Sequence, residues 1–275
     1  MQTVEYHLYR AKFIKSVQIG IFHDDLSSRQ VFEMALAERP SLELRKNNVW
    51  HIGNIEQITS DSGRFAVGRT TTTTLEKFDS NTGNFKDLVD DSGPYTFVYF
   101  DSRLGLLGIG KRAKVAADVT SIAKKIERLL SKSEIVKAQS ISVRVDFIPD
   151  PESFLEKLRS AYSIKRFNAH FTGPNPIDAD ELFQKPMSYY CQQLGGDRGS
   201  VAVSGKSLND DVVANVAKST AATANAASAL IQIERGTRPV LISFKGDAQK
   251  VIIDQDASKM ETLEAILYAY NEIRG

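Results

Sequence analysis

The chain has few of the residues on which several protein classes depend. Its 275 residues include one cysteine, Cys191, and four histidines, which excludes an internal disulfide framework and leaves little material for a Cys/His metal site. No stretch reaches the roughly 18 consecutive apolar residues of a membrane span. Charged residues interrupt Met1–Phe22, so no secretory signal is predicted. We therefore expect a cytoplasmic protein without direct membrane insertion, in which Cys191 is a small buried hydrophobe.

The near-neutral total charge conceals an asymmetry along the chain. The formal net charge is +1, yet residues 101–140 hold nine basic and four acidic residues, a local surplus of five positive charges. Residues 16–100 have a net negative charge, with 12 acidic and eight basic residues. This segregation predicts one surface that attracts a polyanion and another that repels it.

The pattern of apolar residues predicts an α+β fold with two lobes, residues 1–138 and 139–275, built from mostly antiparallel sheets with helices packed on them. Each lobe is long enough to bury its own core. Period-two alternation predicts strands over 3–22, 42–45, 49–55, 63–74, 95–100, 104–109, 141–147, 164–171 and 200–204. The turn residues Asn47-Asn48 and Asp101-Ser102-Arg103 predict hairpins between 42–45 and 49–55 and between 95–100 and 104–109. Amphipathic spacing and capping residues predict helices over 27–36, 118–131, 151–161 and 259–273.

Less regular segments give four further expectations. The acidic stretch that includes Asp87 and ends at Pro94 predicts a loop. Pro186 predicts a break in the partly helical segment 178–191. An alanine-rich run predicts one long helix over 209–231, either sandwiched within its lobe or placed at a subunit interface. Segments 239–244 and 248–253 predict a last hairpin around Gly246-Asp247.

Basic side chains gather on and around the predicted helix 118–131. Its apolar residues share one side, while Lys124 and Arg128, four positions apart, share the other. A solvated face is the ordinary explanation for such charges, but further cations before the helix and on later strands favour contacts with a phosphate backbone. The candidate nucleic-acid-binding residues are Lys111, Arg112, Lys114, Lys124, Lys125, Arg128, Lys165, Arg166, Arg198 and Lys206.

Several motifs are similar to catalytic or cofactor sites without matching them. Ser204-Gly205-Lys206-Ser207 is similar to the end of a phosphate-binding P-loop, but the upstream Gly199 lies six positions before Gly205 instead of five. A lysine at a helix start would still hold a backbone phosphate. The glycines of 105–110 lie within an apolar strand, which indicates a sheet edge or bend. His23-Asp24-Asp25 has no second metal-ligand cluster at matching spacing. We therefore predict no catalytic residues, no metal and no cofactor.

Short blocks and the order of elements resemble the RexA-like phage exclusion proteins. The blocks are Tyr6-His7-Leu8-Tyr9-Arg10-Ala11-Lys12, Val49-Trp50-His51-Ile52, Phe97-Val98-Tyr99-Phe100-Asp101 and His170-Phe171-Thr172-Gly173. The resemblance spans most of the chain and is weakest in the C-terminal third. It implies a two-lobed homodimer that binds DNA largely without sequence preference, defends a prophage against other phages and works with a separate membrane protein. No site residue follows from it, and the ten candidates come from charge clustering alone.

The leading hypothesis is therefore a non-enzymatic, sequence-nonspecific DNA-binding protein of phage exclusion or antiphage defence. One alternative is a metal-dependent nuclease or nucleotide-processing effector, with carboxylates such as Asp24, Asp25, Asp90 and Asp91 brought together from different loops. Another is a protein-interaction module that uses the alanine-rich helix and does not bind nucleic acid. The sequence leaves these three classes open.

Overall fold

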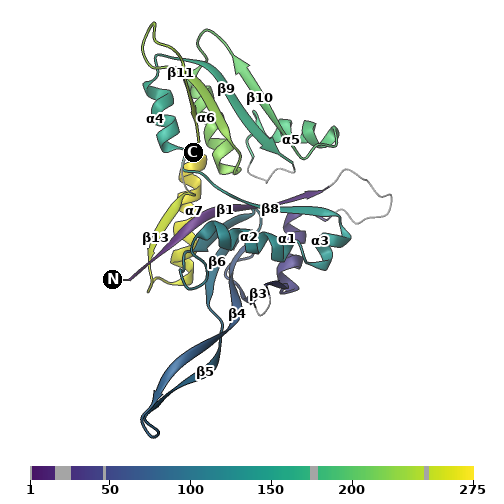
Figure 1. Cartoon of the computed structure of the whole chain (residues 1–275). Helices are drawn as coiled ribbons and strands as arrows, with labels where there is room; N and C mark the ends of the chain where they lie inside the picture. The colour runs from purple at the N-terminus through teal and green to yellow at the C-terminus, as the bar shows by residue number, and fades with distance from the viewer. Residues whose placement is uncertain (1, 16–25, 46–47, 174–178, 245–247) are drawn as a thin grey trace.

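The computed structural model describes residues 2–15, 26–45, 48–173, 179–244 and 248–275 (Figure 1). Two antiparallel sheets organise these residues, and helices pack on each of them, which confirms the α+β class. In Figure 1 the larger sheet and its helices form the lower body, and the smaller sheet with its helices forms the upper body. No helix within the described ranges has both the length and the apolar character needed to cross a membrane.

The larger sheet draws its strands from both ends of the chain. They are β1 (Thr3–Lys15), β2 (Ser41–Arg45), β3 (Asn48–Gln57), β4 (Ser62–Asp79), β5 (Asn84–Ser92), β6 (Tyr95–Asp101), β7 (Leu106–Gly110), β8 (Ile141–Phe147) and β13 (Lys250–Asp254). The main order is β13-β1-β7-β6-β4-β3-β2, while β5 pairs with β4 and β8 pairs with β1. The predicted hairpins β2–β3 and β6–β7 are confirmed. The part of the predicted N-terminal strand after residue 15 lies outside the described residues.

Helices cover the two faces of this sheet, and their apolar spacing explains which side each one buries. They are α1 (Ser28–Ala37), α2 (Val119–Leu130), α3 (Glu134–Ala138) and α7 (Lys259–Arg274). Ser27 caps α1 by accepting the Gln30 N–H, and the Gln30 side chain bonds back to Ser27 in a capping box. Helices α1, α2 and α7 agree with the predicted segments, whereas α3 was not predicted. Capping at Ser27 and Asp118 fixes where α1 and α2 begin.

Strand β1 supplies the cores on both faces because successive side chains point to opposite sides of a sheet. Tyr9 and Phe13 lie in the core beneath α1, α2 and α3. Leu8 lies in the other core, beneath α7, and is completely buried. Full burial of such side chains contributes about 1.5–3 kcal/mol each. The continuous burial of residues 6–14 therefore reflects a central strand that is covered on both sides.

The smaller sheet has the order β10-β9-β11-β12 and is also antiparallel. Its strands are β9 (Ser163–Thr172), β10 (Arg198–Ser204), β11 (Ala227–Gln232) and β12 (Val240–Ser243). The accompanying helices are α4 (Glu152–Ser160), α5 (Gln184–Gln193) and α6 (Asp210–Ala222). Side chains of α4 and α6 form a third core with β9 and β11. The sheets do not divide the chain at one point, since β8 and β13 return to the larger sheet from residues after 139.

The prediction of one helix over 209–231 is wrong, because the chain turns after Ala222 and continues as β11. Ala224 has a φ of 51°, in the left-handed region that cannot continue a right-handed helix. The Thr223 hydroxyl donates to the carbonyls of Ser219 and Thr220, which satisfies the end of α6. Alanine favours helices intrinsically, but pairing with β9 overrides this preference in β11.

The last predicted hairpin is also wrong, because its two strands belong to different sheets. Strand β12 pairs with β11, whereas β13 pairs with β1. The expected turn at Gly246-Asp247 lies outside the described residues. Each strand has a hydrophobic pattern that suits a sheet, but this pattern does not specify the partner strand.

Two smaller expectations fail for local reasons. The predicted acidic loop contains β5, which pairs with β4 from Asn84 to Ser92. Pro186 does not break its helix, because it is the third residue of α5, where its missing N–H has no intrahelical partner to lose.

Gly108 determines how closely α7 approaches β7. A Cβ atom added at Gly108 would lie 2.6 Å from Ile266 Cδ1, whereas one added at Gly53 on β3 would meet nothing within 4 Å. We expect Gly108→Val to lower the free energy of unfolding by about 1–3 kcal/mol through overpacking. The matched change Gly53→Val should leave it within about 0.5 kcal/mol of the wild type. Urea denaturation of both variants measures this, and an equal loss in both would contradict the proposed role of the close contact.

Candidate nucleic-acid interface

The structure distributes the ten predicted cations over three regions. The segment after β7 and helix α2 carry six of them, the start of β9 and the segment after β10 carry three, and the first residue of β10 is the tenth. The first group is Lys111, Arg112, Lys114, Lys124, Lys125 and Arg128. The second group is Lys165, Arg166 and Lys206, and the single residue is Arg198.

The four acidic residues of segment 101–140 are all engaged in local structure. Asp101 is buried and accepts from Ser62 and from the backbone N–H groups of Arg103 and Leu104. Asp118 caps α2, Glu127 accepts the Val145 N–H of β8 at 2.8 Å, and Glu134 pairs with Lys137 at 2.6 Å. Hydrogen bonds from the Ser121 backbone and side chain lower the pKa of Asp118. These carboxylates therefore stabilise the fold at their own positions.

Helix α2 consequently exposes a cationic face. Its apolar side chains are buried on the sheet, while Lys124 and Arg128 are exposed on the solvent side. Lys114 before the helix and Lys132 after it are exposed as well. None of these four cations has a carboxylate oxygen within 4.0 Å among the described residues. We call Lys114, Lys124, Arg128 and Lys132 the α2 face; Lys132 was not among the ten candidates.

Three neighbouring cations are held against the larger body. Lys111 lies 3.5 Å from Glu5 Oε1. Arg112 donates to the Tyr95 carbonyl at 2.7 Å and lies over the Tyr95 ring, 5.4 Å from its centroid. Lys125 Nζ lies 6.0 Å from the centroid of the Trp50 ring, a geometry at the limit of a cation–π interaction. These cations border the α2 face but already have partners within the protein.

The cations of the smaller body form a separate group. Lys165 Nζ donates to the Lys206 carbonyl at 2.7 Å, and Arg166 lies opposite Ser204 in the sheet register. Arg198 lies opposite Thr172, six residues along β9 from Arg166, which corresponds to about 20 Å at 3.3 Å per residue. The structure thus brings Lys165, Arg166 and Lys206 together and leaves Arg198 apart from them.

Lys206 is not at a helix start, which corrects the expectation of a phosphate bound there. Helix α6 begins at Asp210 with Asn209 as its cap, and its first turn contains Asp210 and Asp211. These two carboxylates complement the positive end of the helix and would repel a phosphate.

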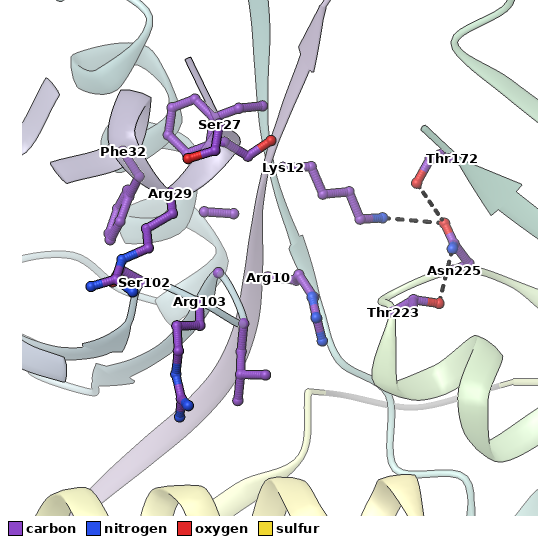
Figure 2. Close-up of a pocket in the computed structure, with 15 residues that line it drawn as sticks. Arg10, Lys12, Ser27, Arg29, Phe32, Ser102, Arg103, Thr172, Thr223 and Asn225 are labelled. Atoms are coloured by element: carbon purple, nitrogen blue, oxygen red, sulfur yellow. Dashed lines mark hydrogen bonds between the residues drawn. The ribbon is translucent and has the colours of Figure 1, made fainter. Parts of the chain in front are cut away.

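A cavity of about 410 Å³ separates the two bodies and is lined by four basic residues that sequence reasoning did not select (Figure 2). Arg10 and Lys12 project from β1 toward the smaller body, while Arg29 and Arg103 lie on the opposite side of the cavity. Arg10 is 1% exposed and Lys12 is 8% exposed. Arg10 and Lys12 lie two and four residues after buried Leu8 on β1, and alternate residues of a strand share one face of the sheet. This spacing was the feature of the sequence that could have identified them as buried.

Both buried cations of β1 bind the C-terminal end of α6. Arg10 Nη1 donates to the Ala222 carbonyl at 2.7 Å and to the Tyr270 hydroxyl at 2.6 Å. Lys12 Nζ donates to the Ala224 carbonyl at 2.9 Å, to Asn225 Oδ1 at 3.2 Å and to Asp146 Oδ2 at 3.1 Å. The carbonyls at a helix C-terminus carry partial negative charge, so they suit cations. These contacts join the two bodies.

The remaining cavity arginines are neutralised by carboxylates. Arg29 Nη2 lies 2.7 Å from Asp61 Oδ1, and Arg103 Nε lies 3.2 Å from Asp61 Oδ2. Arg29 also bonds Glu33 at 2.8 Å. Because protein acceptors already bind all four basic residues, the cavity is a joint between the two bodies and a weaker candidate for anion binding than the α2 face.

Models of known protein families give no match to this chain, and no curated protein is significantly similar to it in sequence. The RexA-like resemblance therefore stays a prediction. Within the described ranges, no group of three or more His, Cys, Asp or Glu side chains is placed to hold a metal ion. Asp24 and Asp25 lie outside those ranges. Cys191 is buried, as expected, and burial raises the pKa of its thiol.

The joint should make stability depend on pH. Burial lowers the pKa of Lys12 from 10.5 to about 8, although Asp146 favours the charged form. Between these two values the unfolded chain binds more protons than the folded chain, so the free energy of unfolding should rise with pH, by up to about 3 kcal/mol at about 1.4 kcal/mol per pKa unit. Lys12→Arg stays protonated and should lack this rise. Urea denaturation from pH 7.5 to 10.5 compares the two proteins, and parallel pH profiles would refute the assignment.

Proposed function

We propose that this protein binds DNA through its sugar-phosphate backbone, without sequence preference, on the α2 face. The observation that carries the proposal is that the acids of segment 101–140 are used within the fold, while Lys114, Lys124, Arg128 and Lys132 face solvent with no carboxylate oxygen within 4.0 Å among the described residues. A phosphate strand would supply the missing negative charge. Release of condensed counterions from DNA would drive the association.

The orientation of α2 favours phosphate contacts over base recognition. Its apolar side is buried on the sheet, so only the solvent side, with Lys124 and Arg128, can meet DNA. Lysines act on phosphates as flexible point charges and carry little sequence information. Arg112 and Lys125 flank this surface and would extend the positive field around it. Lys165, Arg166 and Lys206 would form a second contact region on the smaller body.

The resemblance to RexA-like proteins supports a cellular role for such binding. By that resemblance we propose that the protein acts in prophage-encoded phage exclusion, as a homodimer that signals to a separate membrane protein. Binding without sequence preference suits this role, because a sensor of invading phage DNA meets sequences that are not known in advance.

Charge reversal on the α2 face tests the proposal. We expect Lys124→Glu/Arg128→Glu to weaken binding to random duplex DNA for all sequences alike, because two phosphate contacts are replaced by repulsion. The slope of log K against log salt should become shallower by about 0.9 for each lost contact, or about 2 in total. Fluorescence anisotropy with labelled duplexes at several salt concentrations measures both quantities.

A variant with the same change in net charge provides the control. Lys157 and Arg159 are exposed on α4 of the smaller body. Lys157→Glu/Arg159→Glu should retain the wild-type salt slope. Absence of wild-type binding at low salt, or equal losses in the two double variants, would refute the α2 face as the binding surface.

A further inference from the structure

Strands β4 and β5 form an arm that extends away from the larger body (Figure 1). The body end of β4 pairs with β3 and β6, but beyond Thr71 its only partner among the described strands is β5. Nine residue pairs join the two strands, from Thr71 opposite Ser92 to Asp79 opposite Asn84. The paired part of the two strands is therefore about 27 Å long at 3.4 Å per residue.

The two faces of the arm carry different charges: one has acidic residues only, while the other has Lys77 and Lys86 together with Asp79, which pairs with Lys86 at 2.9 Å. Residues directly opposite each other in an antiparallel pair share a face, and alternate residues of a strand share a face. Glu76 lies opposite Asp87, and Phe78 lies opposite Phe85, so these four residues form one face. Lys77 lies opposite Lys86 on the other face. We call the first of these the acidic-aromatic face.

The acidic-aromatic face is exposed and lacks compensating charge. Phe78 and Phe85 are 52% and 79% exposed, with ring centroids 5.1 Å apart. Neither Glu76 nor Asp87 has a basic nitrogen within 4.0 Å among the described residues.

The isolated arm is energetically unfavourable. Like charges directly opposite in a sheet destabilise the pair, and a two-stranded ribbon is marginally stable in water. A partner with positive charge and apolar surface would offset these costs.

We propose that the acidic-aromatic face of one copy docks on the α2 face of a second copy. Charge complementarity supports this occupant: the arm presents two unpaired carboxylates beside two aromatic rings, and α2 presents Lys124 and Arg128 without carboxylate partners among the described residues. An arginine also stacks favourably on an exposed aromatic ring. The arm points away from its own body in Figure 1, so its tip is free to reach a second copy.

Two copies can exchange arms reciprocally, which gives a closed twofold dimer with two equivalent contacts. The docked arm would cover the surface proposed for DNA, so DNA and the partner's arm would compete for it. The contact rests on the homodimer of the proposed function, but it needs no DNA. Dimerisation and DNA binding can therefore be tested separately.

A charge-swap experiment tests the contact in the full chain. The arm variant Glu76→Lys/Asp87→Lys and the helix variant Lys124→Glu/Arg128→Glu should each be monomers with the mass of one 30.5 kDa chain, whereas the wild type forms a dimer. An equimolar mixture of the two variants should form a heterodimer, because the reversed arm meets the reversed helix and the other contact stays as in the wild type. Light scattering after size-exclusion chromatography gives the masses.

Three results would overturn the arm exchange: a wild type that is monomeric at all concentrations tested, a single variant that remains dimeric, or a mixture that stays monomeric. The matched control is Lys77→Glu on the opposite face of the arm, which leaves the Lys86–Asp79 ion pair intact and should stay dimeric, and its dissociation would also count against the proposal. Circular dichroism checks that each variant is folded. The monomeric arm variant keeps the α2 cations, so its DNA titration distinguishes failure of dimerisation from failure of DNA binding.

Discussion

The burial of Arg10 and Lys12 between the two bodies is the constraint on which the rest of the structure depends. A cation removed from water requires hydrogen-bond acceptors around it, and here the C-terminal carbonyls of α6 supply them. Helix α6 must therefore end at this joint. There the Thr223 hydroxyl donates to a carbonyl of the last helical turn, and the backbone changes direction at Ala224. The joint also continues into the smaller body, because Asn225 Nδ2 donates to Gln184 Oε1 of α5 at 3.2 Å. Two charges on one strand thus fix both the end of a helix and the orientation of a sheet.

This arrangement explains why total charge is a poor guide to the surface of the protein. Arg29, Arg103, Arg10 and Lys12 count as positive in the composition, but their charges are satisfied at the joint. Asp118 and Glu127 count as negative, but they cap α2 and bind β8. Among the described residues of the larger body, unpaired positive charge gathers on the α2 face and unpaired negative charge on one face of the arm. A net charge of +1 therefore results from surfaces of opposite sign.

The sequence was sufficient where local signals agree with tertiary structure. Ser27 and Asp118 cap helices whose apolar spacing is unambiguous, and the hairpins β2–β3 and β6–β7 follow from their turns. It was insufficient where partners are distant in the chain. Pairing of β13 with β1 depends on which sheet edge is free, and β11 is a strand because β9 lies beside it, despite its alanines. The burial of Lys12 has no local cause in the sequence, since the acceptors around it lie more than 130 residues away.

The arm is a second case in which the local sequence did not indicate that a segment pairs as a strand. Acidic residues between strands ordinarily indicate a loop, and Asp87 and the acidic residues after it predicted a loop where the structure has β5. In the fold, pairing with the threonine-rich β4 keeps this stretch extended, so its carboxylates occupy fixed positions on one face instead of a disordered segment. Fixed charges can be matched by a second fixed surface with little further loss of conformational entropy. A paired acidic ribbon and a cationic helix face on the same chain therefore favour association between copies more than either charge cluster would alone.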